Sequence, residues 1–264
     1  MGKYISVFRI AWQQNLIYRL NFVLWRFRSV MQLLLVYFIW WSVFQSQKQI
    51  FGYTASSILT YILIAALIRA IVLSTRVTDL IDSINSGSVV NFLIKPLGFV
   101  KYYLARDIAD KLFNILFYIG EVSVLVFLLK PAVIIQTNIQ VLAYFIFAIA
   151  GGLVIYFCIN FLISLTAFWM ENSWGPLFLI GVLLETLGGG LFPLDILPRE
   201  IFNILMITPF PYLIYFPSKI YLGGMRNAEI LYGFSIISAW IITLIILTKL
   251  MISSGFRHFS AEGN

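Results

Sequence analysis

The residues of this sequence that could do chemistry are few and far apart. The chain of 264 residues holds one cysteine, Cys158, and one histidine, His258. A metal centre built from thiolates or imidazoles needs several such ligands, and a nucleophilic triad needs a histidine beside its nucleophile. The phosphate-binding pattern G-x-x-x-x-G-K-S/T does not occur. We therefore expect no catalytic, cofactor or metal site in this chain.

Three ionisable residues, Arg69, Glu121 and Glu185, lie inside long apolar runs. A charge in lipid costs about 2.5–3.5 kcal/mol or more, so each needs a partner, water or a route to the interface. At about 1.5 Å of rise per residue, all three lie roughly 10–16 Å from the inner ends of their segments. We expect Arg69 to pair with Glu121, with Glu185 as the alternative partner. Snorkelling of Arg69, a protonated glutamate and contact with a transported molecule are the other interpretations.

Composition indicates which elements position these charges. Hydrophobic residues make up 61% of the chain and charged residues 11%, whereas soluble domains have about 45–50% and about 25%. One globular core of this length could not bury so much apolar surface. This excludes a soluble enzyme, a nucleic-acid-binding domain and a disordered regulator. It predicts an all-α polytopic membrane protein, because the long runs are apolar on every side and do not alternate as barrel strands do.

Six apolar segments reach the length of about 20 residues that a bilayer crossing needs. Most of the 18 Lys and Arg residues fall on the side of the N-terminus, and such an excess marks the cytoplasmic side. We therefore expect both termini in the cytoplasm and a single domain over residues 1–264. The net charge of +7 fits an anionic inner leaflet better than a nucleic acid. The six predicted spans are 22–44, 54–74, 112–129, 141–168, 174–191 and 229–252.

Before the first span, apolar side chains recur at helical spacing with polar residues between them. They predict an amphipathic helix lying in the inner interface. The apolar positions are Ile5, Phe8, Trp12, Leu16 and Leu20.

The segment between the second and third spans, residues 76–111, predicts short cytoplasmic helices. Apolar residues at positions 77, 80, 81 and 84 share one helical face. A glycine then ends the helix, and a second apolar patch precedes a proline. Such helices either rest on the lipid surface or dock a cytoplasmic partner. If the helices dock a partner, the residues that we expect to couple it to the membrane spans are Asp79, Asp82, Gly87, Phe92, Leu93, Lys95 and Pro96.

The segment before the last span, residues 188–224, is apolar but broken by a triple glycine and five prolines. It is therefore too irregular to cross as one helix. Irregular backbone at membrane depth is tolerated only against protein or a cavity. We expect a pair of short helices that dip in from the outer face, with a peripheral outer loop as the alternative.

Four stretches, taken in order, resemble the membrane subunit of ABC type-2 exporters. More narrowly, the chain is similar to the branch that includes permeases for drug, viologen or lipid export. The resemblance implies a connecting helix before the first span, a coupling helix between the second and third spans, and an outer re-entrant hairpin before the last. It favours a docking role for the cytoplasmic helices. The four stretches are SGSVVNFLIKPL (86–97), AFWMEN (167–172), GGGLFPLDILP (188–198) and ITPFPYLIYFPSKIYLG (207–223).

The resemblance also implies a function. Two permeases, identical or related, would sit above two P-loop ATPase subunits that bind ATP and Mg²⁺, so this chain itself would bind no cofactor. We expect a non-catalytic, multi-pass subunit of a prokaryotic plasma membrane, in contact with lipids and not with nucleic acid. It would export an apolar or amphipathic substrate, drug-like or lipid-like. The alternative is an ion-coupled secondary transporter that uses Glu121 or Glu185, although no inverted repeat is visible.

Overall fold

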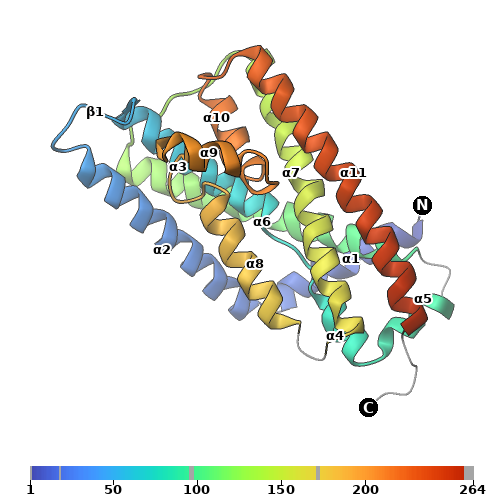
Figure 1. Ribbon diagram of the computed structural model, residues 1–264. Coiled ribbons are helices and arrows are strands. Elements are labelled where there is room, and N and C mark those ends of the chain that lie inside the picture. Colours follow the sequence, from blue (N-terminus) through green and yellow to red (C-terminus); the bar gives the residue numbers. More distant parts are fainter. Residues whose placement is uncertain (1, 18, 95–97, 171–172, 259–264) are drawn as a thin grey trace.

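The computed structural model describes residues 2–17, 19–94, 98–170 and 173–258. Most of its long helices run in roughly the same direction (Figure 1). The start of α1 (Gly2–Ile17) and the end of α11 (Asn227–His258) both lie toward the end that carries α4 (Asp79–Asn85). The strand β1 (Gln49–Ile50) lies at the opposite end. We call these the α4 end and the β1 end.

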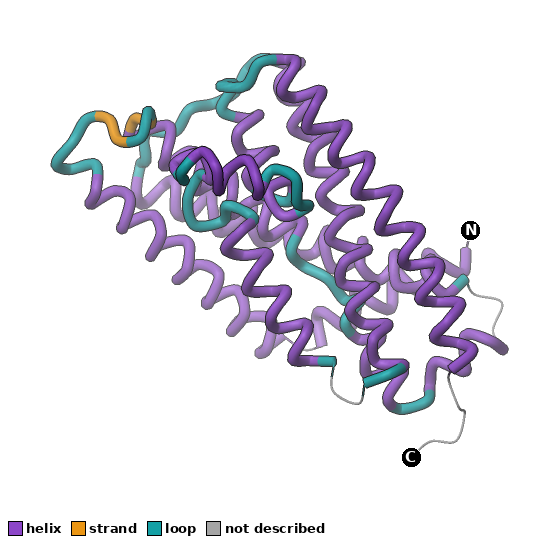
Figure 2. The backbone as a smooth tube through the Cα atoms, in the orientation of Figure 1, coloured by secondary structure: helices purple, strands orange, loops and turns teal. Residues whose placement is uncertain are grey.

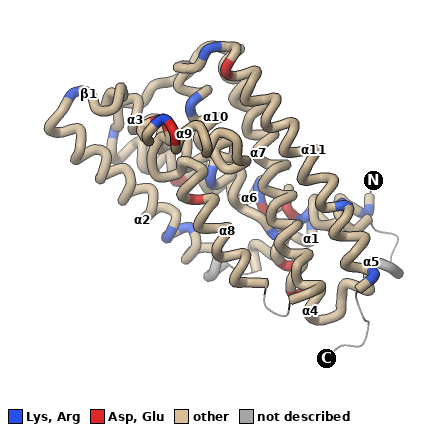
Figure 3. Tube along the Cα trace, viewed as in Figure 1, with Lys and Arg blue, Asp and Glu red and all other residues tan. Residues whose placement is uncertain are grey.

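Five helices in the described part of the chain are long and apolar enough to cross a bilayer. This confirms a polytopic helical membrane protein. Charged residues are absent from α7 and from the middle of α11 (Figure 3). The fifth predicted span, 174–191, is a helix of only 14 residues, α8 (Trp174–Leu187), so length alone does not establish a sixth crossing. The five long helices are α2 (Arg19–Val43), α3 (Ala55–Val72), α6 (Phe99–Leu129), α7 (Ile139–Leu165) and α11, and η2 (Thr166–Phe168) continues α7.

The helix α1 packs along α6. The Trp12 ring meets the Phe113 ring edge-on, with centroids 5.2 Å apart, and Asn15 is buried. Three positions of the predicted apolar stripe, Ile5, Leu16 and Leu20, are exposed. The face packed on α6 therefore carries Trp12 and Asn15, while the exposed apolar side chains are those that an interfacial helix would turn toward lipid.

A small hairpin at the β1 end departs from the all-α prediction. The strands β1 and β2 (Tyr53–Thr54) pair antiparallel. The two residues between them, Phe51 and Gly52, both have positive φ, as the tight turns of such hairpins require. The Thr54 hydroxyl then accepts a bond from Ser57 N at 3.3 Å and caps α3.

Two short helices precede α11, α9 (Arg199–Leu205) and α10 (Tyr215–Tyr221). Their residues match the predicted pair of short helices. The helix α10 is buried against α7 and α3, whereas α9 exposes Ile201 and Ile204. Each is preceded by one turn of 3-10 helix, η3 (Leu194–Ile196) and η4 (Phe210–Tyr212) respectively.

The main core joins α3, α4, α7, α10 and α11. A second, smaller core joins α2 to α3 through residues such as Tyr37 and Ile62. The helix α8 buries only Leu184, so it is the least embedded of the apolar helices. The fold therefore combines a well-packed body with a loosely attached α8 beside it.

Candidate functional site: a cavity beside a helix break

A break separates α3 from α4. The helix α3 ends at Val72, and residues 73–78 have no regular secondary structure before α4 begins at Asp79 (Figure 2). We call residues 73–78 the helix break. Its carbonyl groups are bound by side chains of other helices: Leu73 O accepts from the Tyr156 hydroxyl at 2.9 Å, and Ser74 O accepts from Lys111 Nζ. The break is therefore held in place by side chains of α6 and α7.

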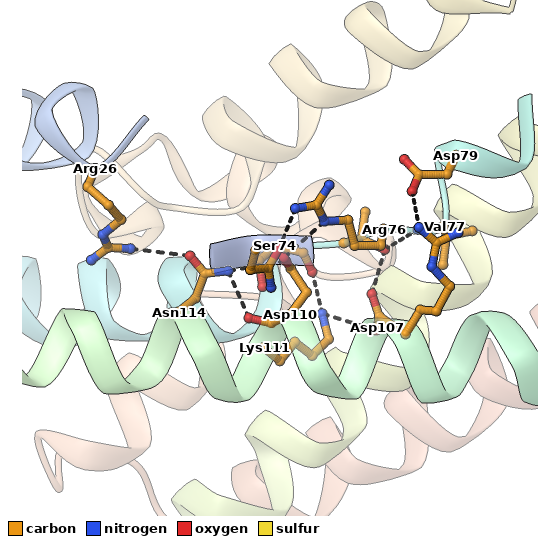
Figure 4. A network of polar contacts seen from close by, with 12 residues as sticks. Arg26, Ser74, Arg76, Val77, Asp79, Asp107, Asp110, Lys111 and Asn114 are labelled. Carbon is orange, nitrogen blue, oxygen red and sulfur yellow. Dashed lines mark hydrogen bonds and ion pairs between the residues drawn. The ribbon is translucent and has the colours of Figure 1, made fainter. Parts of the chain in front are cut away.

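Lys111 and Asp107 on α6 form the centre of this arrangement (Figure 4). Lys111 Nζ lies 3.3 Å from Asp107 Oδ2 and donates to Val72 O at 3.3 Å. The Thr75 hydroxyl donates to Asp107 Oδ1 at 2.6 Å. Asp107 is 1% exposed and Lys111 is 7% exposed. The sequence analysis missed this pair, because charges at the start of a span look like a solvated cytoplasmic helix.

Further ionic contacts extend from the break to α1 and α4. Arg76 Nε lies 3.2 Å from Asp110 Oδ1, and a second nitrogen of Arg76 donates to Asn15 Oδ1 on α1. Arg106 Nη2 lies 2.5 Å from Asp79 Oδ2 at the start of α4. The break, α1 and the start of α4 are thereby all tied to α6 (Figure 4).

The expected pair of Arg69 with Glu121 is wrong. Arg69 Nη1 lies 2.8 Å from Glu185 Oε1, which was the alternative partner, and Gln32 Nε2 donates to the same oxygen at 2.8 Å. Glu121 instead binds Arg26 of α2, whose Nε donates to Glu121 Oε1 at 2.6 Å. Estimated depth and chain order fix the level of a charge but not the side of the helix that carries it.

The triple glycine follows α8 and lies against α3. Gly189 has φ +82°, and a Cβ there would lie 2.8 Å from Tyr215 Cβ and 2.9 Å from the Tyr61 hydroxyl. Tyr61 donates that hydroxyl to Gly189 O at 2.6 Å. At Gly190 a Cβ would lie 2.5 Å from Arg69 Nη2, which donates to Gly190 O at 3.0 Å. Only glycine leaves the backbone open to these two side chains of α3.

A cavity of about 900 Å³ lies between α2 and α8 on one side and the helix break, α6 and α7 on the other. Its size falls within the range of small-molecule sites. Aromatic rings of Phe22, Trp25 and Phe178 line it together with polar groups. These polar groups belong to Gln32, Ser74, Asn114, Asn160 and Glu185 among others.

A second cavity of about 220 Å³ adjoins the first, since Trp25, Gln32 and Glu185 line both. Arg69 and Glu121 also line the second cavity. The three charges that the sequence singled out therefore come together at this pair of cavities. Every one of them has an oppositely charged partner within the chain.

The predicted apolar face of the cytoplasmic segment is present but is covered by this chain's own core. Val77, Leu80 and Ile81 are each fully buried, and Ile84 is nearly so. That face is therefore not available to a partner. The sequence pattern identifies an apolar face without showing what packs on it.

The other residues assigned to this segment have different surroundings. Asp82 is exposed, and Gly87 has φ +73°, the conformation expected at the end of a helix. The Phe92 ring packs edge-on against Tyr102 with centroids 4.9 Å apart. Leu93 belongs to α5 (Asn91–Ile94), which follows η1 (Ser88–Val90). Lys95 and Pro96 lie outside the described residues, as do Glu171 and Asn172 of the AFWMEN stretch.

A polar cluster at the β1 end joins the hairpin to α10. Lys219 Nζ donates to Asp195 Oδ2 at 2.6 Å, and the Tyr53 hydroxyl donates to Asp195 Oδ1 at 2.9 Å. Burial, reinforced by the Asp195 carboxylate, raises the pKa of the Tyr53 phenol, so the phenol stays protonated. Across the described ranges, no three His, Cys, Asp or Glu side chains are grouped so that they could hold a metal ion.

Comparison with known proteins identifies a family for this chain. The family model described as "ABC-2 family transporter protein" matches residues 30–263. Neither a curated protein nor a solved structure matches the chain. The matched range includes the helix break, α8 and the triple glycine, but not α1 or the first part of α2.

Proposed function

The chain belongs to the ABC-2 family of transporter proteins, and on that premise we propose that it is the permease subunit of an ATP-driven exporter. A separate cytoplasmic P-loop ATPase would bind and hydrolyse ATP with Mg²⁺. The observation that carries this proposal is the cavity of about 900 Å³, which a transported molecule could occupy. Its mixed aromatic and polar lining favours an apolar or amphipathic substrate, drug-like or lipid-like.

The proposed orientation places the α4 end in the cytoplasm of a prokaryotic cell, with both termini on that side. The excess of Lys and Arg assigned to this end supports it. In this orientation α8 is the sixth crossing, and residues after it return to the outer face. Gly189 and Gly190 contact Tyr61 and Arg69, which lie six and fourteen residues along α3, about 9 and 21 Å from its start. A segment that starts so deep supports a re-entrant hairpin.

Single cysteines test this orientation. Placed at Arg199 and at Arg226 in a Cys158→Ala background, both should react with a membrane-impermeant thiol reagent added from outside. Reaction of either one only from inside would mean a further crossing and a wrong topology. A cysteine at Lys101, on the cytoplasmic part of α6 in this proposal, should react only from inside and serves as the control.

We propose that the ATPase docks on the polar surface of the α4 segment, because its apolar face is buried. The exposed positions there include Asp82, Ser86 and Ser88. We also propose that a second permease, identical or related, packs near α8, whose Trp174, Phe178 and other apolar side chains are exposed. Obligate interfaces are enriched in such apolar surface.

The deciding experiment purifies the chain from its native membrane with its ATPase and reconstitutes both into vesicles. ATP should drive movement of a fluorescent amphipathic dye, and a proton or sodium gradient alone should not. Transport driven by a gradient without ATP would favour the ion-coupled alternative and refute the proposal. Asp82→Arg should release the ATPase with an unchanged Tm, whereas Lys48→Asp, at the β1 end, should not release it.

A further inference from the structure

The end of α3 carries unpaired carbonyl groups that a positive charge satisfies. The last four C=O groups of a helix have no partner within it, and the partial negative charge there favours cations. Val72 O is one of these groups, and it accepts from Lys111 Nζ at 3.3 Å. Ser74 O, two residues into the break, accepts from the same nitrogen.

The third contact of this nitrogen is Asp107 Oδ2 at 3.3 Å. An ammonium group has three N–H donors and no acceptor, so these three oxygens use all of its donors. The centroid of the Tyr156 ring lies 5.7 Å from the nitrogen, which is within the range of a cation–π contact. Asp107 is itself fixed by the Thr75 hydroxyl at 2.6 Å.

The charges around the site are paired separately. Arg76 Nε lies against Asp110 Oδ1, and Arg106 lies against Asp79. Asp107 is therefore the carboxylate that neutralises Lys111. Because both residues are almost completely buried, an empty site would leave the Asp107 carboxylate uncompensated, which is costly.

We propose that Val72 O, Ser74 O and Asp107 form a monovalent-cation site that the chain fills with its own Lys111 ammonium. Ion-coupled transporters bind Na⁺ at the carbonyl groups of broken helix ends, and the oxygens here are of the same kind. In this chain the cation is tethered by its side chain. The helix break therefore keeps its shape without Na⁺ or K⁺ from solution. This inference goes beyond the transport function proposed above and does not rest on it.

Two substitutions at one position test the proposal. Lys111→Ala removes the ammonium and leaves room for a free cation, whereas Lys111→Met removes the charge but fills the same space with an apolar chain. Each purified full-length variant is heated in detergent while tryptophan fluorescence reports unfolding. The buffers contain Na⁺, K⁺, methylammonium or the bulky N-methylglucamine cation at equal ionic strength.

The expected result is specific to one variant. The Tm of Lys111→Ala should rise along a saturating curve with at least one of the small cations, as mass action requires for a ligand that binds the folded state. The Tm of the unmodified chain, of Lys111→Met and of Lys101→Ala, an exposed lysine on the same helix, should not depend on the cation. Adding Asp107→Asn to Lys111→Ala should abolish the rise.

Equal Tm values of Lys111→Ala in all four salts would overturn the proposal, because a purely structural lysine predicts a loss that no cation repairs. Should Lys111→Ala yield no folded protein in any of these salts, the unmodified chain provides the second measurement. Reductive methylation of the folded protein should modify Lys101 and leave Lys111 unmodified until the protein is unfolded. Complete methylation of Lys111 in the folded chain would refute a permanently occupied site.

Discussion

The ion pair between Arg69 and Glu185 allows a quantitative test of how α8 is attached. The two charged groups are 2.8 Å apart, and their side chains are 19% and 30% exposed. At an effective dielectric constant of about 20, the gross attraction is about 6 kcal/mol. Desolvation cancels most of this, and breaking a buried pair by removing one partner costs about 3–5 kcal/mol. Partial exposure lowers our expectation to about 2 kcal/mol for Glu185→Gln.

The assay is a double-mutant cycle on thermal unfolding in detergent. A loss of 1 kcal/mol lowers the Tm of a chain of this size by about 2–4 °C, so Glu185→Gln should lower it by about 4–8 °C. Arg69→Gln should cost a similar amount. The double variant should recover part of the sum, with a coupling of about 1–2 kcal/mol, as for residues in direct contact.

The control cycle combines Arg69→Gln with Glu121→Gln. Glu121 is bound by Arg26, not by Arg69, so the coupling in this cycle should be well below that of the first cycle. Additive losses in the first cycle would refute the Arg69–Glu185 pairing. A strong coupling in the control cycle would instead restore the pairing that depth alone predicted.

Three further predictions follow from single contacts. Gly189→Ala should lower the Tm by several degrees, because a left-handed conformation costs a non-glycine residue about 1–2 kcal/mol and the new Cβ has no space. The control Gly181→Ala, whose Cβ meets nothing within 4 Å, should not lower the Tm, since alanine is the better helix former. Because folding raises the pKa of Tyr53, the protonated phenol stabilises the fold below the unfolded pKa of about 10, and this contribution is lost at higher pH. The Tm advantage of the unmodified chain over Tyr53→Phe should therefore shrink between pH 9 and pH 12. Trp12→Ala should expose α1 to protease in detergent, because it removes the ring that contacts Phe113; unchanged digestion would contradict the α1–α6 packing.

The sequence predicts the five long apolar helices and the broken outer segment because both depend on local composition. A run of apolar residues needs a bilayer or a core whatever its neighbours are. The triple glycine was likewise visible in the sequence. Its structural reason was not, because Tyr61 and Arg69 reach it from more than one hundred residues away.

The charged residues at the start of α6 show the limit of reasoning from the sequence. Asp107, Asp110 and Lys111 occur at a spacing that also suits a solvated helix. They become a buried network only because the helix break supplies unpaired carbonyl groups beside them. Such a match between side chain and backbone depends on tertiary packing, and no local pattern encodes it.

The same contacts indicate which wall of the cavity is fixed. Lys111, Asp110 and Arg106 attach the break and the start of α4 to α6, so these elements form one unit. The helix α8 forms the other wall with few buried residues, and its polar attachments include Arg69 and Gln32 at Glu185. On the proposed function, a push on α4 would therefore move the break and α6 together relative to α8. On the same proposal, the two cavities would change volume at Glu185, which lines both of them and is held by Arg69.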